Sequence, residues 1–336
     1  MACRMLLPSV LAMCHCRRLK GNRLVRVAIL ILLLVLYCEW LHYFAVLLQC
    51  TWPRLQKSVA GGWSSNTEDL KVMFLADTHL LGFREGHWFD KVRREWQMQR
   101  AFQTSMLLHR PDVVFILGDL LDEGKWCDDD EFQYHVERFN SMFSVPSGTQ
   151  RHLVVGNHDI GFHYMITSHK SSGLRKRLVR QVWQCYTFKV SSLFLLNSMA
   201  MEGDAFFLYT VRQDINCSTQ DAAPEEEKII AFRPRHDTLS KQATRQLFKM
   251  LDPRLVIGAH THHGCYRIHD NGTPEWTVAS FSWRNKQSPS FLMARISSET
   301  HKVHLCLMPT NSQVIYIYVI GGIVILVTTF LAFPFQ

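Results

Sequence analysis

Four short polar motifs carry residue types that bind divalent metals. They are Asp77-Thr78-His79, Gly118-Asp119, Gly156-Asn157-His158-Asp159 and His260-Thr261-His262, and each follows an apolar run typical of a buried strand. Carboxylate oxygens, an amide oxygen and imidazole nitrogens together suit Mn, Fe or Zn. A single Asp after a strand is usually a turn or helix cap, so no one motif is decisive. The ordered set of four indicates a metal site.

The elements that must position these motifs alternate between strands and helices. The sequence predicts strands at 71–77, 113–119 and 152–157, separated by helices at 87–108 and 129–143. This order implies right-handed crossovers and a mostly parallel sheet, with ligands bound beyond the carboxyl ends of its strands. A spacing of two on an extended segment predicts that Asp77 and His79 point the same way, as do His260 and His262. We expect all four motifs to meet in one crevice.

The rest of the middle region is also predicted to be folded. Further strands are expected at 186–190, 193–197, 205–211, 255–259, 266–269, 276–279, 291–296 and 303–307, and a helix at 241–251 with Ser240 as its N-cap.

The net charge of +8 is concentrated at the amino terminus. Residues 1–26 hold six basic residues and no acidic one, which leaves +2 for the rest of the chain. A basic chain commonly indicates nucleic-acid binding, but this arm precedes an apolar run at 27–48 that is long enough to cross a bilayer, so we expect no nucleic-acid partner. A cleaved signal peptide is the alternative, disfavoured because the run is long and Gln49-Cys50-Thr51 is not a small-residue cleavage site.

A second apolar run at 314–333 predicts another span. The positive-inside rule then places the arm in the cytosol and the middle region in the lumen, as a linker at 49–69 and a folded domain at 70–308. Two glycosylation acceptor patterns, at Asn216 and Asn271, agree because both lie between the spans. Six of the ten cysteines also lie there, where disulfides are permitted, but their spacing does not indicate the pairing.

At these motifs the chain resembles the calcineurin-like metallophosphoesterases, over about residues 70–308. The resemblance implies an α/β sandwich of two β-sheets flanked by helices, here with a transmembrane helix at each end, and a site for two divalent metal ions of the Mn2+ type. Longer stretches resemble the two-span membrane members of this family: FLADTHLLG, REWQMQRAFQT, VVFILGDLLDEGKW, VVGNHDIGFHY, NSMAMEGD and SFSWRN.

Those membrane members imply a specific task. They remove ethanolamine phosphate from the second mannose of GPI anchors, which promotes ER-to-Golgi transport of GPI-anchored proteins. The resemblance therefore implies the GPI-anchor glycan as substrate and a cargo receptor of GPI-anchored proteins as a partner. It places the protein in membranes of ER exit sites, the ER–Golgi intermediate compartment and the cis-Golgi, with the catalytic domain lumenal.

The resemblance also suggests a role for each motif residue. Asp119 would bridge the two metals, with Asp77, His79 and His262 completing one site and Asn157 and His260 holding the other. His158 would protonate the leaving alkoxide, for which a pKa near ambient pH is suitable. Asp159 would either orient His158 or cap the turn.

Two departures from the family pattern bear on activity. The family has a further metal-binding His that opens an H-Y-P-L-Y-R-like stretch, whereas the corresponding residues 205–212 read AFFLYTVR, without a His. This leaves the second metal one ligand short and predicts a weak enzyme. The usual Gly before H-x-H is Ala259, whose Cβ is either tolerated or crowds the site. Two alternatives to the GPI function therefore stay open: a phosphoesterase for another lipid-linked phosphate, or a non-enzymatic protein that binds GPI glycan.

Overall fold

The computed structural model describes residues 23–55, 68–161, 183–188, 191–196, 217–228 and 238–331. The chain divides into two compact units. One comprises residues 46–308, and the other is formed by residues 1–45 and 309–336 together. The boundaries of the larger unit include the domain predicted at 70–308 and the linker predicted at 49–69.

A five-stranded sheet forms the centre of the larger unit. Its strand order is β10 (His301–Leu307), β9 (Ser290–Ile296), β1 (Leu70–Ala76), β2 (Val113–Leu117) and β3 (Gln150–Leu153). The first three strands along the chain are parallel, with Phe74 opposite Phe115. Strand β9 pairs in the antiparallel direction with both of its neighbours, β1 and β10. The sheet is therefore mixed, and the predicted parallel arrangement is confirmed for its first half.

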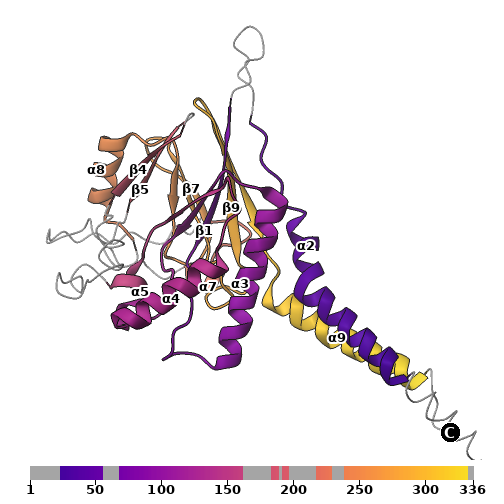
Figure 1. Ribbon diagram of the computed structural model, residues 1–336. Helices are drawn as coiled ribbons and strands as arrows, with labels where there is room; N and C mark the ends of the chain where they lie inside the picture. The colour runs from indigo at the N-terminus through magenta and orange to yellow at the C-terminus, as the bar shows by residue number, and fades with distance from the viewer. Residues whose placement is uncertain are drawn as a thin grey trace, which may run out of the picture. The chain divides into compact units, whose positions relative to one another are not determined.

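Both faces of this sheet are buried, which explains why its central strands read as continuous apolar runs. Val72, Phe74 and Ala76 of β1 belong to a core cluster that packs against the second layer of the sandwich. Met73 and Leu75 point to the opposite face and are fully buried. The helices α3 (Trp88–His109) and α4 (Asp129–Met142) lie on one side of the sheet, and the smaller strands on the other (Figure 1).

The second layer consists of two small sheets. One is the hairpin β4 (Trp183–Thr187) and β5 (Ser192–Leu196). The other has the order β6 (Val256–Gly258), β8 (Pro274–Thr277) and β7 (Cys265–Ile268), in which β6 and β8 are parallel. Side chains of both sheets pack on the core cluster, so the predicted two-sheet sandwich is confirmed.

Capping residues fix where the helices begin. Asp128 accepts a hydrogen bond from Glu131 N at the start of α4, and Ser240 accepts one from Ala243 N at the start of α8 (Lys241–Leu251), as predicted. Three short helical segments complete the unit: η2 (Gly124–Trp126), α5 (Asn157–Ile160) and α7 (Glu225–Lys228). The strand predicted at 205–211 lies outside the described residues.

The other unit contains two helices that are long and apolar enough to cross a membrane, Arg23–Leu47 and α9 (Asn311–Leu331). The first includes a π-helical turn, η1 (Tyr37–Leu41), and ends as α2 (His42–Leu47). Their side chains meet, because Glu39 accepts a hydrogen bond from Tyr318 at 2.6 Å, and a Cβ on Gly321 would lie 2.5 Å from Leu34. The small residue allows close helix packing, and the hydrogen bond satisfies the one carboxylate in the apolar run.

Candidate metal centre

The chain delivers its polar motifs from the carboxyl ends of strands, as the sequence predicts. Asp77 follows β1 directly, Asp119 follows β2 after Gly118, and His260 and His262 follow β6. Parallel backbone pairing continues past the strand ends, since Asp77 N donates to Leu117 O and His79 N donates to Asp119 O, each at 3.0 Å. This pairing keeps the first two motifs side by side.

Four of the predicted residues form one buried cluster. Asp77, His79, Asp119 and His262 each offer a ligand atom, and these atoms all lie within 4.8 Å of one another. His79 Nε2 lies 3.0 Å from His262 Nε2 and 3.5 Å from Asp119 Oδ2. Asp77, His79 and Asp119 are almost completely buried. The set has the residue types and spacing of a divalent-metal site.

The backbone at these residues is unusual. Asp77, His79, His260 and His262 all have positive φ, with values of 50°, 44°, 87° and 62°. The prediction that extended backbone aligns each pair is therefore wrong, although Asp77 and His79 do converge. A positive φ costs a residue with a side chain roughly 1–3 kcal/mol, and such strain is typical of functional sites where the surroundings enforce it.

The electrostatics of the cluster favour a cation. Burial and the charge on Asp119 raise the pKa of Asp77, because two carboxylates are held together away from water. Burial and the neighbouring imidazoles lower the pKa of His262 to about 3, so its ring is neutral and suited to metal binding. Asp77 Oδ1 is buried and has no hydrogen-bond partner among the described residues. These features fit a divalent metal ion at this position.

The remaining predicted ligands lie around Asp119. His260 Nδ1 is 3.9 Å from Asp119 Oδ2, and the His260 backbone N–H donates to Asp77 Oδ2 at 3.0 Å. Asn157 opens α5 and is buried, and its Oδ1 has no hydrogen-bond partner among the described residues. The next residue, His158, donates its backbone N–H to Asp119 Oδ1 at 2.8 Å. The structure thus places Asn157 and His260 beside the carboxylate predicted to bridge the metals.

Two glycines give Asp77 and Asp119 their space. A Cβ on Gly118 would lie 2.4 Å from Asp77 Oδ1, and a Cβ on Gly156 would lie 2.2 Å from Asp119 Oδ1. The side chain of Ala259 packs against the core cluster.

Two residues that the sequence analysis missed, Asp122 and Arg284, lie behind the imidazoles and hold them in place. Asp122 is buried and accepts from His79 Nδ1 at 2.8 Å, while its backbone carbonyl accepts from His158 Nδ1 at 2.8 Å. Arg284 Nη2 lies 2.7 Å from Asp122 Oδ2. Burial acts to raise the pKa of Asp122, but the hydrogen bonds from His158 and His79 outweigh it and hold this pKa below its usual range. The available signal was the position of Asp122 in the same GDLLD turn as Asp119.

Asp122 influences the tautomer of His79 and the pKa of His158. Because Asp122 accepts from His79 Nδ1, the lone pair of His79 Nε2 is directed at the cluster. Burial lowers the pKa of His158, but its hydrogen bond to Asp122 and the charge on Asp119 outweigh this, so the net pKa is raised. His158 is 30% exposed, which leaves it accessible to a substrate.

Asp159 caps the turn and does not orient His158. Its carboxylate accepts from the backbone N–H groups of Gly156, Leu120 and Leu121, at 2.8, 3.1 and 2.7 Å. Burial and the charge on Asp119 raise its pKa to about 8, against the lowering effect of these three donors. Asp159 therefore joins the turn after β2 to the start of α5. The predicted strand at 152–157 ends earlier, at Leu153, because this capped turn replaces its last residues.

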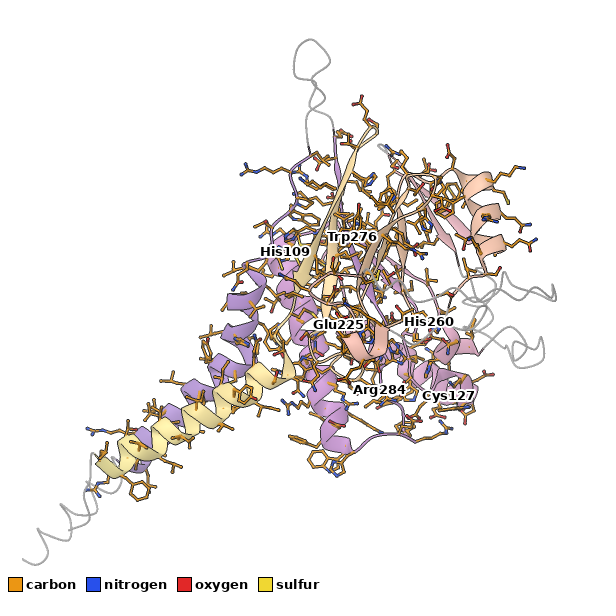
Figure 2. The ribbon with its side chains drawn as sticks, turned by 180° about the vertical axis from the view of Figure 1, so that it is seen from behind. His109, Cys127, Glu225, His260, Trp276 and Arg284 are labelled. Carbon is orange, nitrogen blue, oxygen red and sulfur yellow. A yellow bond between two sulfur atoms is a disulfide. The ribbon has the colours of Figure 1, made fainter. Side chains whose placement is uncertain are left out.

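Another group with metal-binding residue types is Cys127, Glu131 and His135. Its arrangement is that of a hydrogen-bond network. Arg84 binds both carboxylate oxygens of Glu131, at 2.6 and 2.8 Å, and Arg138 Nη1 donates to His135 Nδ1 at 2.9 Å. Guanidinium groups therefore already bind both oxygens of Glu131 and one nitrogen of His135. In Figure 2, Arg284, His260 and Cys127 lie at one end of the larger unit, and His109 and Trp276 lie away from it.

Comparison with known proteins agrees with this geometry. Residues 70–264 match the calcineurin-like phosphoesterase family model. The chain is 38% identical to Metallophosphoesterase 1 of Gallus gallus, covering 87% of this chain and 86% of that protein, and 37% identical to Metallophosphoesterase 1 of Pongo abelii, covering 96% and 94%. Among solved structures, a dimetal phosphatase of Danio rerio covers 70% of this chain and 98% of its own, with 12% identity and a TM-score of 0.39.

Proposed function

The chain belongs to the calcineurin-like phosphoesterase family, and from this we propose that it is a metal-dependent phosphodiesterase that removes ethanolamine phosphate from the second mannose of GPI anchors. The observation that carries the hydrolase activity is the cluster of Asp77, His79, Asp119 and His262, of which the first three are buried. The substrate rests on the resemblance of the longer sequence stretches to the GPI-processing membrane members of the family.

Each ligand has a place in this proposal. Asp77, His79 and His262 would hold one metal ion, Asn157 and His260 would hold the other, and Asp119 would contribute to both. We take both ions to be Mn2+. When bound, two such ions polarise the phosphoryl oxygens and make hydroxide available near neutral pH. The neutral amide of Asn157 adds no negative charge beside a phosphate.

His158 supplies the proton for the leaving alkoxide. Its Nδ1 is fixed by the Asp122 carbonyl, so Nε2 is the atom that can give a proton to a substrate oxygen. The raised pKa keeps the ring protonated closer to neutral pH, as a general acid requires. Asp122 connects this proton donor to His79, so one carboxylate orients both groups.

The proposed setting is the lumen of the early secretory pathway, from ER exit sites to the cis-Golgi. The two candidate membrane helices and the Cys217–Cys265 disulfide support a membrane protein with an oxidised, lumenal domain. Asn271 is exposed in a turn and suits glycosylation, and Asn216 lies outside the described residues. The partners in this proposal are the GPI-anchor glycan and a cargo receptor of GPI-anchored proteins.

A weakened or non-catalytic role is the second candidate, and one observation favours it. The stretch 205–212 contains no His, and it lies outside the described residues. His163 and His169, which are considered as substitutes for the absent ligand, also lie outside the described residues. In this alternative the domain binds GPI glycan, or acts slowly on another lipid-linked phosphate.

Two measurements separate these functions. Detergent-solubilised full-length protein with added Mn2+ should hydrolyse a bis-aryl phosphodiester, and Asp119→Ala should abolish the reaction. No difference between the two proteins would identify a binder. An enzyme that is active on this substrate should then release ethanolamine phosphate from a defined GPI glycan. Failure there, with the bis-aryl activity intact, would refute the substrate and leave the hydrolase.

A further inference from the structure

Two buried cysteines lie near the two ends of the larger unit. Cys50 follows the end of α2 at Leu47, and Cys306 is on β10, shortly before the start of α9. Both are free thiols in this structure, and both are buried, with 8% of Cys50 and 0% of Cys306 exposed. Their side chains are in hydrogen-bonding contact with each other. Both belong to the unit that spans residues 46–308.

Independent contacts support this proximity. Trp52, two residues after Cys50, donates its indole N–H to the His109 carbonyl at 3.0 Å. The His109 side chain also hydrogen bonds to the Leu47 backbone, so the segment around Cys50 is held on both sides. The His109 ring lies 6.5 Å from that of Phe291, which is the register partner of Cys306 across β9 and β10. This chain of contacts leads from Cys50 to Cys306 through His109, which is labelled in Figure 2.

The surroundings suit a neutral disulfide better than reactive thiolates. Cys306 Sγ lies 3.2 Å from Met293 Sδ, which is fully buried, and 3.8 Å from His304 Nδ1. Burial and the neighbouring Cys50 raise the pKa of the Cys306 thiol. The same unit already holds the Cys217–Cys265 disulfide, which shows that it is compatible with an oxidising compartment.

We infer that Cys50 and Cys306 form a second disulfide in the mature protein, closing the larger unit at its two ends. In the reaction, one cysteine thiolate attacks a protein disulfide of the secretory compartment and forms a mixed disulfide. The other cysteine then displaces the carrier. The two thiols lose two electrons and two protons in total, and the carrier disulfide is reduced to a dithiol.

This bond joins segments that are far apart along the chain. Cross-linking residues at such a distance removes much of the freedom of the unfolded domain, and the effect grows with the length of the closed loop. The bond would also fix the segment that follows the first candidate span against the last strand before the second. The inference does not depend on the substrate, and it concerns residues outside the metal centre.

Peptide mapping tests the bond directly. The full-length protein is expressed in a eukaryotic secretory pathway and denatured in the presence of N-ethylmaleimide, which alkylates free thiols. It is then digested with pepsin without reduction. We expect a linked peptide that contains Cys50 and Cys306. The Cys217–Cys265 peptide is the internal positive control, and the exposed Cys185 should be alkylated. Alkylation of both Cys50 and Cys306, or a bond from either to another cysteine, would overturn the inference.

Thermal unfolding of variants gives a second measurement. We compare Cys50→Ser, Cys306→Ser and the double variant, with Cys185→Ser as a control that should not change Tm. If the bond exists, each single variant lowers Tm by roughly 5–15 °C, and the double variant lowers it no further. Additive losses in the double variant would show two independent thiols and would contradict the bond.

Discussion

Asp122 connects three side chains of the site, although it is not one of the predicted ligands. Its carboxylate binds His79 Nδ1, lies 3.4 Å from His158 Nδ1, and forms an ion pair with Arg284. Arg284 also pairs with Glu85 at 3.0 Å. A residue that touches no substrate therefore orients both a metal ligand and the proton donor.

Replacing Asp122 with Asn tests this role. The amide lacks the charge that holds the His79 N–H and Arg284, so the imidazole loses its fixed orientation. Loss of such a supporting partner typically costs 10–100-fold in metal affinity or activity, and we expect a decrease of about this size in both. Mn2+ binding measured by calorimetry and hydrolysis rates check it. Asp130→Asn, an exposed acid of α4, is the matched control. Equal Mn2+ affinity in the two variants would contradict the role.

Gly156 is required for a different reason, because a side chain there would occupy the position of a ligand. The added Cβ would lie 2.2 Å from Asp119 Oδ1 and 2.6 Å from Asp119 N. Gly156→Ala should therefore displace Asp119 and reduce activity about 100-fold, as misplacement near 1 Å can do. Gly258→Ala meets only an ordinary contact of 3.4 Å with Glu275 and should stay close to wild type. Similar rates for the two variants would show that Asp119 is not confined by the turn.

The sequence predicted the residues that gather at the site but not how they are held. Asp77, His79, Asp119 and His262 were recognisable because each follows an apolar strand. Asp122 and Arg284 were not, because a carboxylate in a turn and an Arg near the chain end have many ordinary roles. Their function depends on a contact between residues 122 and 284, which no local pattern encodes.

At the level of elements, strand positions were predictable and connections were less so. The buried strands β1 and β2 are apolar on both faces, and this alone identifies them. The end of β3 was placed too far along the chain, since Asp159 draws the following residues into a capped turn. The antiparallel β9 also escaped a prediction of a mostly parallel sheet, because strand order depends on long-range pairing.

The β6–β8–β7 sheet that carries His260 and His262 is stabilised by Glu275. This half-buried carboxylate accepts from Arg267 Nε at 2.7 Å and from His269 Nε2 at 2.6 Å. Burial acts to raise its pKa, but the bonds to His269 and Arg267 outweigh it, and the net pKa is lowered. A lowered folded-state pKa means that the contribution to stability is present above the unfolded value of about 4.3 and is lost as the pH falls below it.

Glu275→Gln should therefore destabilise the domain at pH 7 by roughly 1–3 kcal/mol, since Arg267 and His269 lose their charged acceptor. The deficit relative to wild type should shrink as the pH falls below about 4.3 towards the folded-state pKa. Thermal unfolding at a series of pH values measures both effects. Glu299→Gln, an exposed site, is the control. A deficit that does not change over this pH range would show that the charge on Glu275 contributes little.

On the scale of the whole molecule, the chain combines a family catalytic fold with two apolar helices at its ends. The Glu39–Tyr318 hydrogen bond and the Gly321–Leu34 packing indicate that these helices associate as a pair. The sequence located both runs by length and hydrophobicity alone. It could not supply the pairing, because the hydrogen bond between Glu39 and Tyr318 joins residues that are far apart in the sequence.

Activity of the whole protein should depend on the ligand that the sequence lacks. From the family resemblance we expect Ala205 to stand at the position of a metal-binding His, and residues 205–212 contain no His. With only Asp119, Asn157 and His260 for the second ion, we expect weak Mn2+ binding and activity that is rescued at millimolar metal. Ala205→His should supply the absent imidazole and lower the Mn2+ concentration for half-maximal hydrolysis at least tenfold. Thr210→His, in the same stretch, is the control and should have no effect. Full wild-type activity at micromolar Mn2+, unchanged by Ala205→His, would show that the chain completes its second metal site with another residue.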